Sequence, residues 1–313
     1  MANLPASIDA PQRVTIVEVS ARDGIQNEQV EFSTKEKIDL IEGSVNAGIR
    51  RIEVASFVNP VRVPQMADGN DVVAGLSKLS LTKAIGLVLN MRGMQRAIET
   101  PIRDVNFVIA ATDAFSKANQ GSTVAESLRV LEEVASLAHE HDIFLGVTIS
   151  VAFGCPFEGE VSLTKLSSIL RHLASINVKE VALADTIGVA VPPQVEASVA
   201  LASDILGDEK AIRCHFHNTR NTGYANVFAA LSRGVRIFDA SIGGIGGCPF
   251  APRSTGNIAT EDLAFMLERA GYDTGLDLDM LIAVNESLTR KMGRELPGLI
   301  ARAGIYPESL ANS

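Results

Sequence analysis

The sequence predicts a (β/α)8 TIM barrel with a C-terminal helical cap, and three observations support this fold. Short β-branched runs alternate with longer stretches of helical periodicity along the whole chain, as in strand–helix units around a parallel sheet. Eight such units fill roughly 270 residues, close to the size of about 250 residues typical of this barrel. No G-x-G-x-x-G follows the first strand, although a doubly wound dinucleotide-binding sheet, the competing fold, would need it there.

The elements follow in order along the chain. Strands are expected at residues 14–19, 51–55, 84–89, 105–110, 144–150, 180–183, 212–216 and 237–241. Amphipathic helices are expected between them, among others at residues 35–47, 124–141, 163–175, 193–206 and 224–232, where apolar residues recur at helical spacing. A further helical pattern at 277–292 and a tail at 297–313 predict a cap on the barrel. Because no linker or break in composition occurs, residues 1–313 are expected to form one domain, with roughly 275–313 as the C-terminal extension.

Composition and charge limit the partners of the protein. Hydrophobic residues make up 46% and charged residues 21% of the 313 residues, which excludes a disordered or fibrous chain. The formal charge of −9 comes from 37 acidic and 28 basic residues, so no global positive field attracts nucleic acid or an anionic membrane. The sequence therefore predicts neither a nucleic-acid nor a membrane partner, and it leaves room for a local basic pocket.

The cysteines and the N-terminus indicate a reducing compartment. The three cysteines, Cys155, Cys214 and Cys248, are an odd number and form no C-x-x-C pair, which argues against a secreted disulfide framework. The first 13 residues lack a basic segment followed by an apolar one, and no run of 18 residues is uninterruptedly apolar. We expect a cytoplasmic protein.

Polar residues gather where the predicted strands end, at the rim that carries the active site in such a barrel. His215 and His217 are two residues apart, so their side chains share one face and can reach a single cation. Asp23 and Asn257 are expected on the same rim. Two imidazoles with oxygen donors suit an octahedral Mg²⁺, Mn²⁺ or Co²⁺ better than a closed Zn²⁺ site. The alternative is a pair of histidines that only bind neighbouring loops.

Other histidines and cysteines have simpler expected roles. His139, His141 and His172 fall in helical stretches, where a solvated surface position is expected. Cys214 lies within a strand and is expected in the core, whereas the position of Cys155 leaves its role open.

Several further residues are candidates for catalysis or binding. Arg22 could stabilise negative charge on an enolate oxygen, or pair with Glu53, or do both. Cys248 lies in a loop with four glycines, where a thiol can be exposed and move over a substrate, although a buried inert thiol is the alternative. That loop lacks the Lys-Ser/Thr ending of a phosphate-binding P-loop. Lys117 and Asn119 are candidates for binding the anionic part of a large ligand, with solvated loop residues as the alternative.

Several long motifs in the right order resemble the hydroxymethylglutaryl-CoA lyase family, within the barrel metallolyases that include isopropylmalate and homocitrate synthases. The matching segments are 17–28, 56–58, 63–66, 154–159, 185–188, 243–249 and 256–262. Gln26, in the first of them, is a further candidate for binding the substrate. The resemblance covers nearly the whole chain, and the loop of Cys248 favours the lyase branch over the synthases.

The resemblance implies a divalent-metal-dependent retro-Claisen cleavage of 3-hydroxy-3-methylglutaryl-CoA to acetyl-CoA and acetoacetate. The implied metal is Mg²⁺ or Mn²⁺, and Co²⁺ or Zn²⁺ could replace it in a preparation. Its ligands would be Asp23, His215, His217 and Asn257. The family's other active-site positions correspond to Arg22, Glu53, Asp185, Cys248 and Glu261. In this scheme a base, Asp23 or His215, takes the hydroxyl proton, Arg22 stabilises the enolate, and Cys248 protonates it.

Departures from the family pattern concern the acyl group. Ser20 and Ala21 stand where Gly-Pro is common, and Gln29 where lysine is frequent. Arg220 and Arg253 are extra rim arginines that could bind a second acidic group. The alternatives are therefore the same chemistry on another 3-hydroxyacyl-CoA, a Claisen-type synthase, and a barrel without catalysis that serves as a scaffold. A homodimer or higher homo-oligomer is expected for such a barrel.

Overall fold

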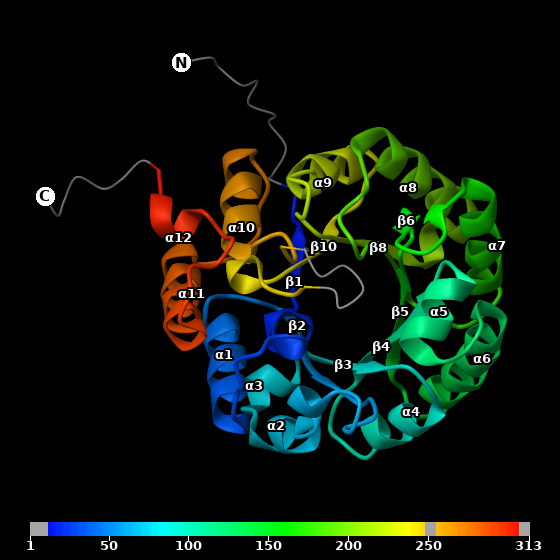
Figure 1. Cartoon of the computed structure of the whole chain (residues 1–313), viewed down its shortest axis with the longest axis horizontal. Coiled ribbons are helices and arrows are strands. Elements are labelled where there is room, and N and C mark those ends of the chain that lie inside the picture. The colour runs from blue at the N-terminus through cyan, green and yellow to red at the C-terminus, as the bar shows by residue number, and fades with distance from the viewer. Residues whose placement is uncertain (1–11, 248–254, 307–313) are drawn as a thin grey trace, which may run out of the picture.

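The computed structural model describes residues 12–247 and 255–306 and confirms the predicted barrel (Figure 1). Eight parallel strands close in the order β1-β10-β9-β8-β5-β4-β3-β2. They are β1 (Thr15–Glu18), β2 (Arg51–Ser56), β3 (Ala84–Val88), β4 (Asp104–Ala110), β5 (Phe144–Ser150), β8 (Glu180–Asp185), β9 (Ala211–Phe216) and β10 (Ile237–Ala240). All eight predicted strands are present. Their short, largely buried runs of β-branched and other apolar residues fit a closed parallel sheet, which is covered on both faces.

Helices surround the barrel (Figure 1). They are α1 (Thr34–Asn46), α2 (Gly69–Gly75), α3 (Lys78–Leu81), α4 (Met91–Ile98), α5 (Asp113–Gln120), α6 (Val124–Glu140), α7 (Leu163–Ala174), α8 (Pro192–Leu206), α9 (Gly223–Ser232), α10 (Thr260–Arg269), α11 (Leu278–Met292) and α12 (Ile300–Ala303). The predicted helices correspond to α1, α6, α7, α8, α9 and α11. A short antiparallel hairpin of β6 (Gly154–Cys155) and β7 (Gly159–Glu160), which was not predicted, follows β5.

Local sequence signals explain where the longer helices begin. Ser33 and Glu36 form a reciprocal capping box at α1, and Thr123 and Glu126 form another at α6. Each box satisfies backbone N–H groups that the first helical turn cannot pair internally. At α8, Pro192 occupies the first turn, where its missing N–H costs nothing.

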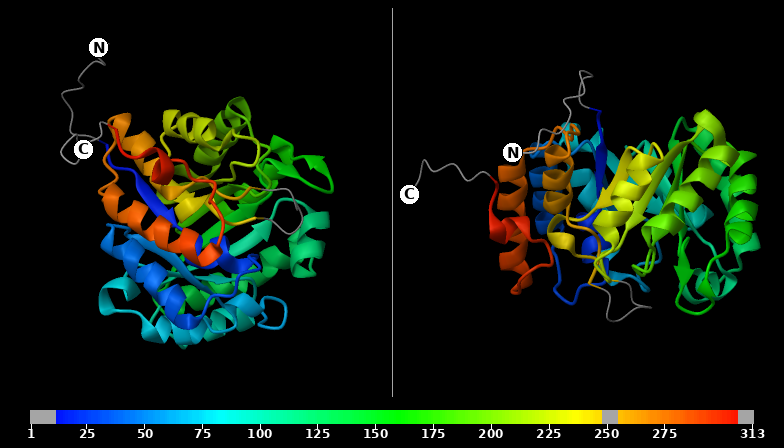
Figure 2. Two further views of the ribbon diagram at one scale, coloured as in Figure 1. Left: turned by 60° about the vertical axis from the view of Figure 1, so that its left-hand side comes forward. Right: turned by 90° about the horizontal axis from the view of Figure 1, so that it is seen from above.

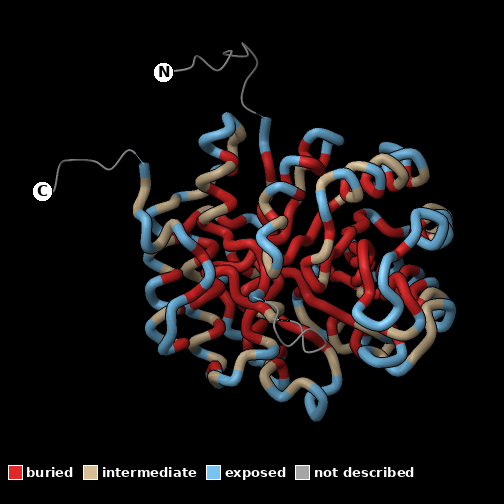
Figure 3. Tube along the Cα trace, turned by 45° about the horizontal axis from the view of Figure 1, so that its top comes forward, coloured by how far each residue is buried: buried red, intermediate tan, exposed pale blue. Residues whose placement is uncertain are grey.

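The main apolar core lies between the barrel wall and the helices, so buried segments form the centre of the molecule and exposed ones its rim (Figure 3). A separate small cluster of Val17, Val19 and Ile85 packs with Ile237. Val17 and Ile237 lie on the paired strands β1 and β10, Val19 follows β1, and Ile85 lies on β3, which β2 separates from β1. One part of the barrel is therefore filled by branched apolar side chains, as is usual for this fold.

The other part of the barrel is filled by charged side chains. Arg51 lies 3.0 Å from Asp104 and 2.6 Å from Glu180, and Arg213 lies 3.2 Å from Glu180. Gly146 on β5 lies beside this network, 3.5 Å from a Glu180 carboxylate oxygen as measured from an ideal Cβ position. Buried carboxylates of this kind are tolerated only because guanidinium groups pair with them.

The C-terminal helices cover one flank of the barrel. Helix α11 packs against α1 and α10, and α12 contacts both α10 and α11, so these helices lie side by side next to the N-terminal helix (Figure 2). Among the described helices, none has the length and apolar character to span a bilayer.

Candidate active site

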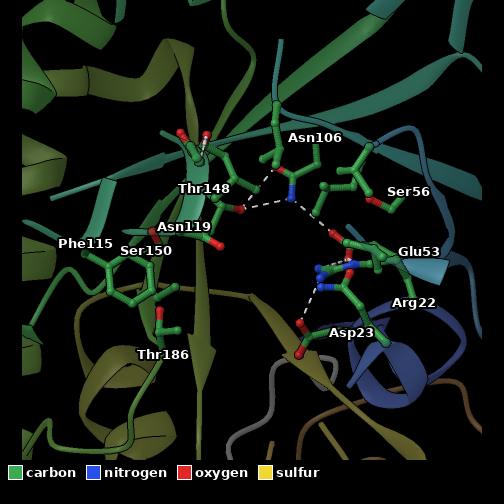
Figure 4. Close-up of a pocket in the computed structure, with 18 of the residues that line it drawn as sticks. Arg22, Asp23, Glu53, Ser56, Asn106, Phe115, Asn119, Thr148, Ser150 and Thr186 are labelled. Atoms are coloured by element: carbon green, nitrogen blue, oxygen red, sulfur yellow. Dashed lines mark hydrogen bonds and ion pairs between the residues drawn. The ribbon is translucent and has the colours of Figure 1, made fainter. Parts of the chain in front are cut away.

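A cavity of about 710 Å³ opens at the carboxyl ends of the strands (Figure 4). Figure 4 shows Arg22, Asp23 and Glu53 on one wall and Ser150 and Thr186 on the opposite one. The site residues predicted from sequence that line the cavity are Arg22, Asp23, Gln26, Glu53, Asn119, His215 and His217. Closure of the barrel therefore brings together residues that lie almost 200 positions apart in the sequence.

A π-helical turn directly after β1, Ser20–Gly24, carries Arg22 and Asp23 into the cavity. Buried Glu18 anchors this turn, because its carboxylate accepts hydrogen bonds from the N–H groups of Ser20 at 2.8 Å and Ile242 at 3.1 Å. Gly24 allows the close approach, since a Cβ there would lie 2.9 Å from both Ile245 and Ser241 side-chain atoms. Single π-helical turns of this type occur frequently at functional sites.

Asp23, His215 and His217 form the predicted metal cluster. One potential ligand atom from each lies within 4.8 Å of the others. His215 is at the end of β9, and His217 follows directly after that strand. The described part of the chain thus contains a set of one carboxylate and two imidazoles that could hold a divalent cation.

Asn257 joins this cluster with an oxygen that has no partner. Its Nδ2 donates to Asp23 Oδ2 at 2.9 Å and to the Ile245 carbonyl at 2.9 Å, while its buried Oδ1 has no hydrogen-bond partner among the described residues. Gly246, with φ of +116°, lies against this amide, since a Cβ there would be 2.4 Å from Asn257 Nδ2. A buried, unsatisfied carbonyl oxygen beside a carboxylate is the donor that a hard cation needs.

The protonation states of two ligands suit metal binding. Burial raises the pKa of Asp23, but the charge of Arg22, the neighbouring imidazoles and a hydrogen bond from Asn257 outweigh it and lower the pKa to about 2. Burial, together with His215, lowers the pKa of His217 to about 3. Both side chains are therefore deprotonated at neutral pH, as metal ligands must be.

Arg22 forms the ion pair with Glu53 that the sequence suggested and a second one with Asp23. Its Nε donates to Glu53 Oε2 at 2.7 Å, and its Nη1 donates to Asp23 Oδ1 at 2.8 Å. Glu53 in turn accepts from Asn106 Nδ2 at 3.0 Å. The guanidinium is thus fixed from two sides while it lines the cavity, which preorganises its charge.

His215 has a carboxylate behind it. Its Nδ1 lies 3.1 Å from Asp239 Oδ2, because the two residues are direct partners in the pairing of β9 with β10. Burial lowers the pKa of His215, but the hydrogen bond to Asp239 and the charges of Asp239 and Asp23 raise it above the ordinary value. A carboxylate on one ring nitrogen fixes the orientation of the ring and leaves the other nitrogen for a ligand.

The charges around the cavity also fit a divalent cation. Asp23, Glu53, Asp104, Glu180 and Asp239 form one connected network with Arg22, Arg51 and Arg213. Burial raises the pKa of Asp104 to about 6. Carboxyl groups therefore outnumber guanidinium groups in the network beside Asp23 and the histidines, which favours a divalent cation there.

Two acidic residues predicted to be catalytic lie behind the cavity wall. The Asp185 carboxylate accepts from the N–H groups of Val189 at 2.9 Å and Ala190 at 3.0 Å, and burial raises its pKa. Glu261 accepts from Gly243 N–H at 3.1 Å and from Asn285 Nδ2. Neither lines the cavity, and each binds backbone N–H groups of a loop instead.

Glu261 gives a test of this placement. Burial raises its pKa to about 7, above the unfolded value of 4.5. A carboxyl group with a raised pKa in the folded state stabilises the fold fully below pH 4.5 and loses that contribution as pH rises through 7. We expect the free energy of unfolding of wild type, measured relative to that of Glu261→Gln, to fall by up to about 3 kcal/mol between pH 4.5 and 8. Urea unfolding of both proteins at several pH values measures this difference, and a constant difference would contradict it.

The predicted substrate-binding residues separate into two groups. Gln26 and Asn119 line the cavity, whereas Lys117 and Arg220 do not. The Arg220 Nη1 donates to the carbonyls of Ile187 at 3.0 Å and Gly188 at 2.9 Å. Its guanidinium therefore braces the loop after β8.

The cysteines and remaining histidines fall where the pattern suggested or outside the described residues. Cys214 is buried in β9, and burial raises its pKa, which confirms the core position. Cys155 is also buried, in the β6–β7 hairpin, where its sulfur accepts from Thr112 Oγ1 at 3.1 Å. His139 and His141 are exposed, and His172 Nε2 lies 3.1 Å from Glu132 on the surface. Cys248 and Arg253 lie outside the described residues.

The sequence analysis missed residues whose signal was present. Residues 211–216 alternate apolar and polar side chains, so Arg213 shares the face of His215. The same alternation places Asp239 on the polar face of β10 and Asn106 on that of β4. Their roles depend on contacts between strands, which the pattern of a single strand does not give.

Comparison with known proteins gives consistent matches over almost the entire chain. A family model described as HMGL-like matches residues 13–288. An (R)-citramalyl-CoA lyase of Chloroflexus aurantiacus is 44% identical over 308 residues, covering 95% of this chain and 97% of that protein. The hydroxymethylglutaryl-CoA lyase YngG of Bacillus subtilis is 37% identical over 288 residues, covering 92% and 96%. A solved structure of an HMG-CoA lyase from Acinetobacter baumannii in complex with coenzyme A and 3-methylmalate has a TM-score of 0.89 and 38% identity, covering 95% and 96%.

Proposed function

Since the chain belongs to the HMGL-like family, whose matched relatives are lyases acting on CoA esters, we propose that it cleaves a CoA thioester with a tertiary hydroxyl β to the thioester carbonyl. The observation that carries this proposal is the cluster of Asp23, His215 and His217 with the unpartnered Asn257 oxygen, facing the fixed Arg22 guanidinium. This arrangement offers a cation site for a hydroxyl and a carboxylate, and a separate positive charge for an enolate.

Mg²⁺ or Mn²⁺ is the proposed cation, held by Asp23, His215, His217 and Asn257. Such a cation would supply Lewis acidity that lowers the pKa of the substrate hydroxyl. Oxygen-rich ligand sets with two imidazoles suit these ions.

The residues of the chain can perform each proton transfer. Asp23 or His215 takes the hydroxyl proton, the bond between the carbinol carbon and the α-carbon breaks, and the carbinol carbon becomes a ketone. The bonding electron pair passes to the α-carbon and forms the enolate of acetyl-CoA, whose oxygen Arg22 stabilises. Protonation of that α-carbon yields acetyl-CoA, and Cys248 is the proposed acid.

Two acyl groups are candidates. The 44% identity to an (R)-citramalyl-CoA lyase, against 37% to a hydroxymethylglutaryl-CoA lyase, supports (R)-citramalyl-CoA. Residues Ser20, Ala21 and Gln29, which depart from the usual lyase motif, lie in or just after the turn that carries Arg22. The second candidate is 3-hydroxy-3-methylglutaryl-CoA, on the shared Arg-Asp, H-x-H and glycine-loop motifs. Cleavage gives pyruvate from the first and acetoacetate from the second, with acetyl-CoA from both.

The test is incubation of metal-reconstituted protein with each thioester, with and without a chelator, followed by mass spectrometry of acetyl-CoA, pyruvate and acetoacetate. We expect chelator-sensitive cleavage, with (R)-citramalyl-CoA the better substrate by kcat/KM. Faster cleavage of 3-hydroxy-3-methylglutaryl-CoA would reverse the order of the two candidates. If neither thioester is cleaved while Mn²⁺ binds, both acyl assignments are wrong. The cytoplasmic location and the homo-oligomer remain predictions.

A further inference from the structure

Arg213 is a fully buried cation that belongs to neither the cavity lining nor the surface. Its side chain is 1% exposed, and it extends from β9 into the interior of the barrel, two residues before His215. Its Nη2 donates to Thr148 Oγ1 at 3.2 Å, and Thr148 lines the cavity. The guanidinium therefore lies directly beneath the cavity floor.

Three carboxylates surround this guanidinium, each with a different second partner. Arg213 lies 3.2 Å from Glu180, 3.3 Å from Asp239 and 4.0 Å from Glu53. Asp239 holds the Nδ1 of His215, and Glu53 holds Arg22. Arg213 is thus the one described cation that contacts the carboxylates behind both halves of the site.

We propose that Arg213 is a positioning residue that fixes the metal-ligand half of the site against the Arg22 half. This inference rests on the proposed function, since it assumes a divalent cation at Asp23 and the two histidines. The guanidinium pairs by charge with all three carboxylates at once, while its Nη2 is anchored by the hydrogen bond to Thr148. Without it, the Asp239, Glu53 and Glu180 carboxylates repel one another, and Asp239 no longer has a second anchor when it orients the His215 ring.

Arg51 provides a matched control for this role. It is also largely buried, and it pairs with Glu180 at 2.6 Å and Asp104 at 3.0 Å. It forms no hydrogen bond or ion pair with Asp239 or Glu53 among the described residues. Replacement of either arginine by methionine removes one interior cation and destabilises the fold, but only Arg213→Met releases the carboxylates behind His215 and Arg22.

The experiment compares Mn²⁺ affinity, by titration calorimetry, and the visible spectrum of bound Co²⁺ in wild type, Arg213→Met and Arg51→Met, each verified as folded by circular dichroism. We expect Arg213→Met to bind Mn²⁺ about 10- to 100-fold more weakly, the cost typical of losing support behind a metal ligand. Its Co²⁺ spectrum should shift, whereas Arg51→Met should match wild type within about threefold in affinity.

The outcomes distinguish this inference from the proposed function. Equal Mn²⁺ affinity in Arg213→Met and Arg51→Met would overturn the positioning role. An equal loss would follow from removing any interior cation, and no loss would show that Arg213 does not support the metal ligands. Absence of Mn²⁺ binding to wild type would overturn the metal site itself. If Arg213→Met does not fold, a comparison of Arg213→Lys with Arg51→Lys tests the same point, since a single ammonium cannot hold three carboxylates. Equal Mn²⁺ affinities of these two variants would again overturn the positioning role.

Discussion

His217→Ala is expected to abolish chelator-sensitive cleavage. The substitution removes one imidazole from the cluster that contains Asp23 and His215, and with it a ligand whose lowered pKa keeps it neutral and ready to bind. A cation in such a site lowers the activation barrier by several kcal/mol. Its loss should therefore lower kcat/KM by about 10³-fold or more. Steady-state kinetics at saturating Mn²⁺, with the substrate that wild type cleaves, provide the measurement.

His172→Ala is the control for this prediction. His172 is a partly exposed residue of α7 whose Nε2 lies near Glu132, far in the fold from the cavity lining. The His172→Ala variant should cleave the substrate at the wild-type rate and retain Mn²⁺ binding. If the two alanine variants were equally active, the assignment of the metal cluster would be wrong.

Arg22→Met is expected to lower kcat by about 10²- to 10³-fold, as when a preorganised donor to a developing oxyanion is removed. Arg22 and Arg62 both line the cavity, but only Arg22 is held there by Glu53 and Asp23. Arg22→Lys should recover only part of the rate, because an ammonium cannot hold both carboxylates in the same geometry. Separate kcat and KM values are needed, since a loss confined to the transition state lowers kcat.

Arg233→Met is a suitable control for the loss of an arginine. Arg233 pairs with Glu196 at 2.9 Å on the surface and is 48% exposed at its side chain, so its removal should leave the kinetics unchanged. A value of kcat within tenfold of wild type in Arg22→Met would show that Arg22 does not stabilise the enolate.

The amino-acid sequence by itself determined the barrel and the grouping of the metal ligands. Short β-branched runs between longer helical patterns mark the strands, and eight such strand–helix units fit a closed barrel. Once the barrel closes, every strand end lies on the same rim. Asp23, His215 and His217 therefore had to meet, although Asp23 is far from the histidines in the sequence.

Only the tertiary structure decided which polar groups face the cavity and which hold its walls. Asp185, Glu261 and Arg220 are rim residues in the sequence, yet their side chains bind backbone groups of loops. A shift of one or two ångströms in a loop exchanges these roles, and residue type does not encode such a shift.

The charged interior is a second feature that only the fold reveals. Arg213 and Asp239 are recognisable as inward-facing residues, but their pairing depends on the register of β9 against β10 and on closure of the barrel. A buried charge is stable only beside its counter-charge, and that counter-charge comes from another strand. The sequence shows which face a residue occupies, whereas the closed sheet determines which residue it meets there.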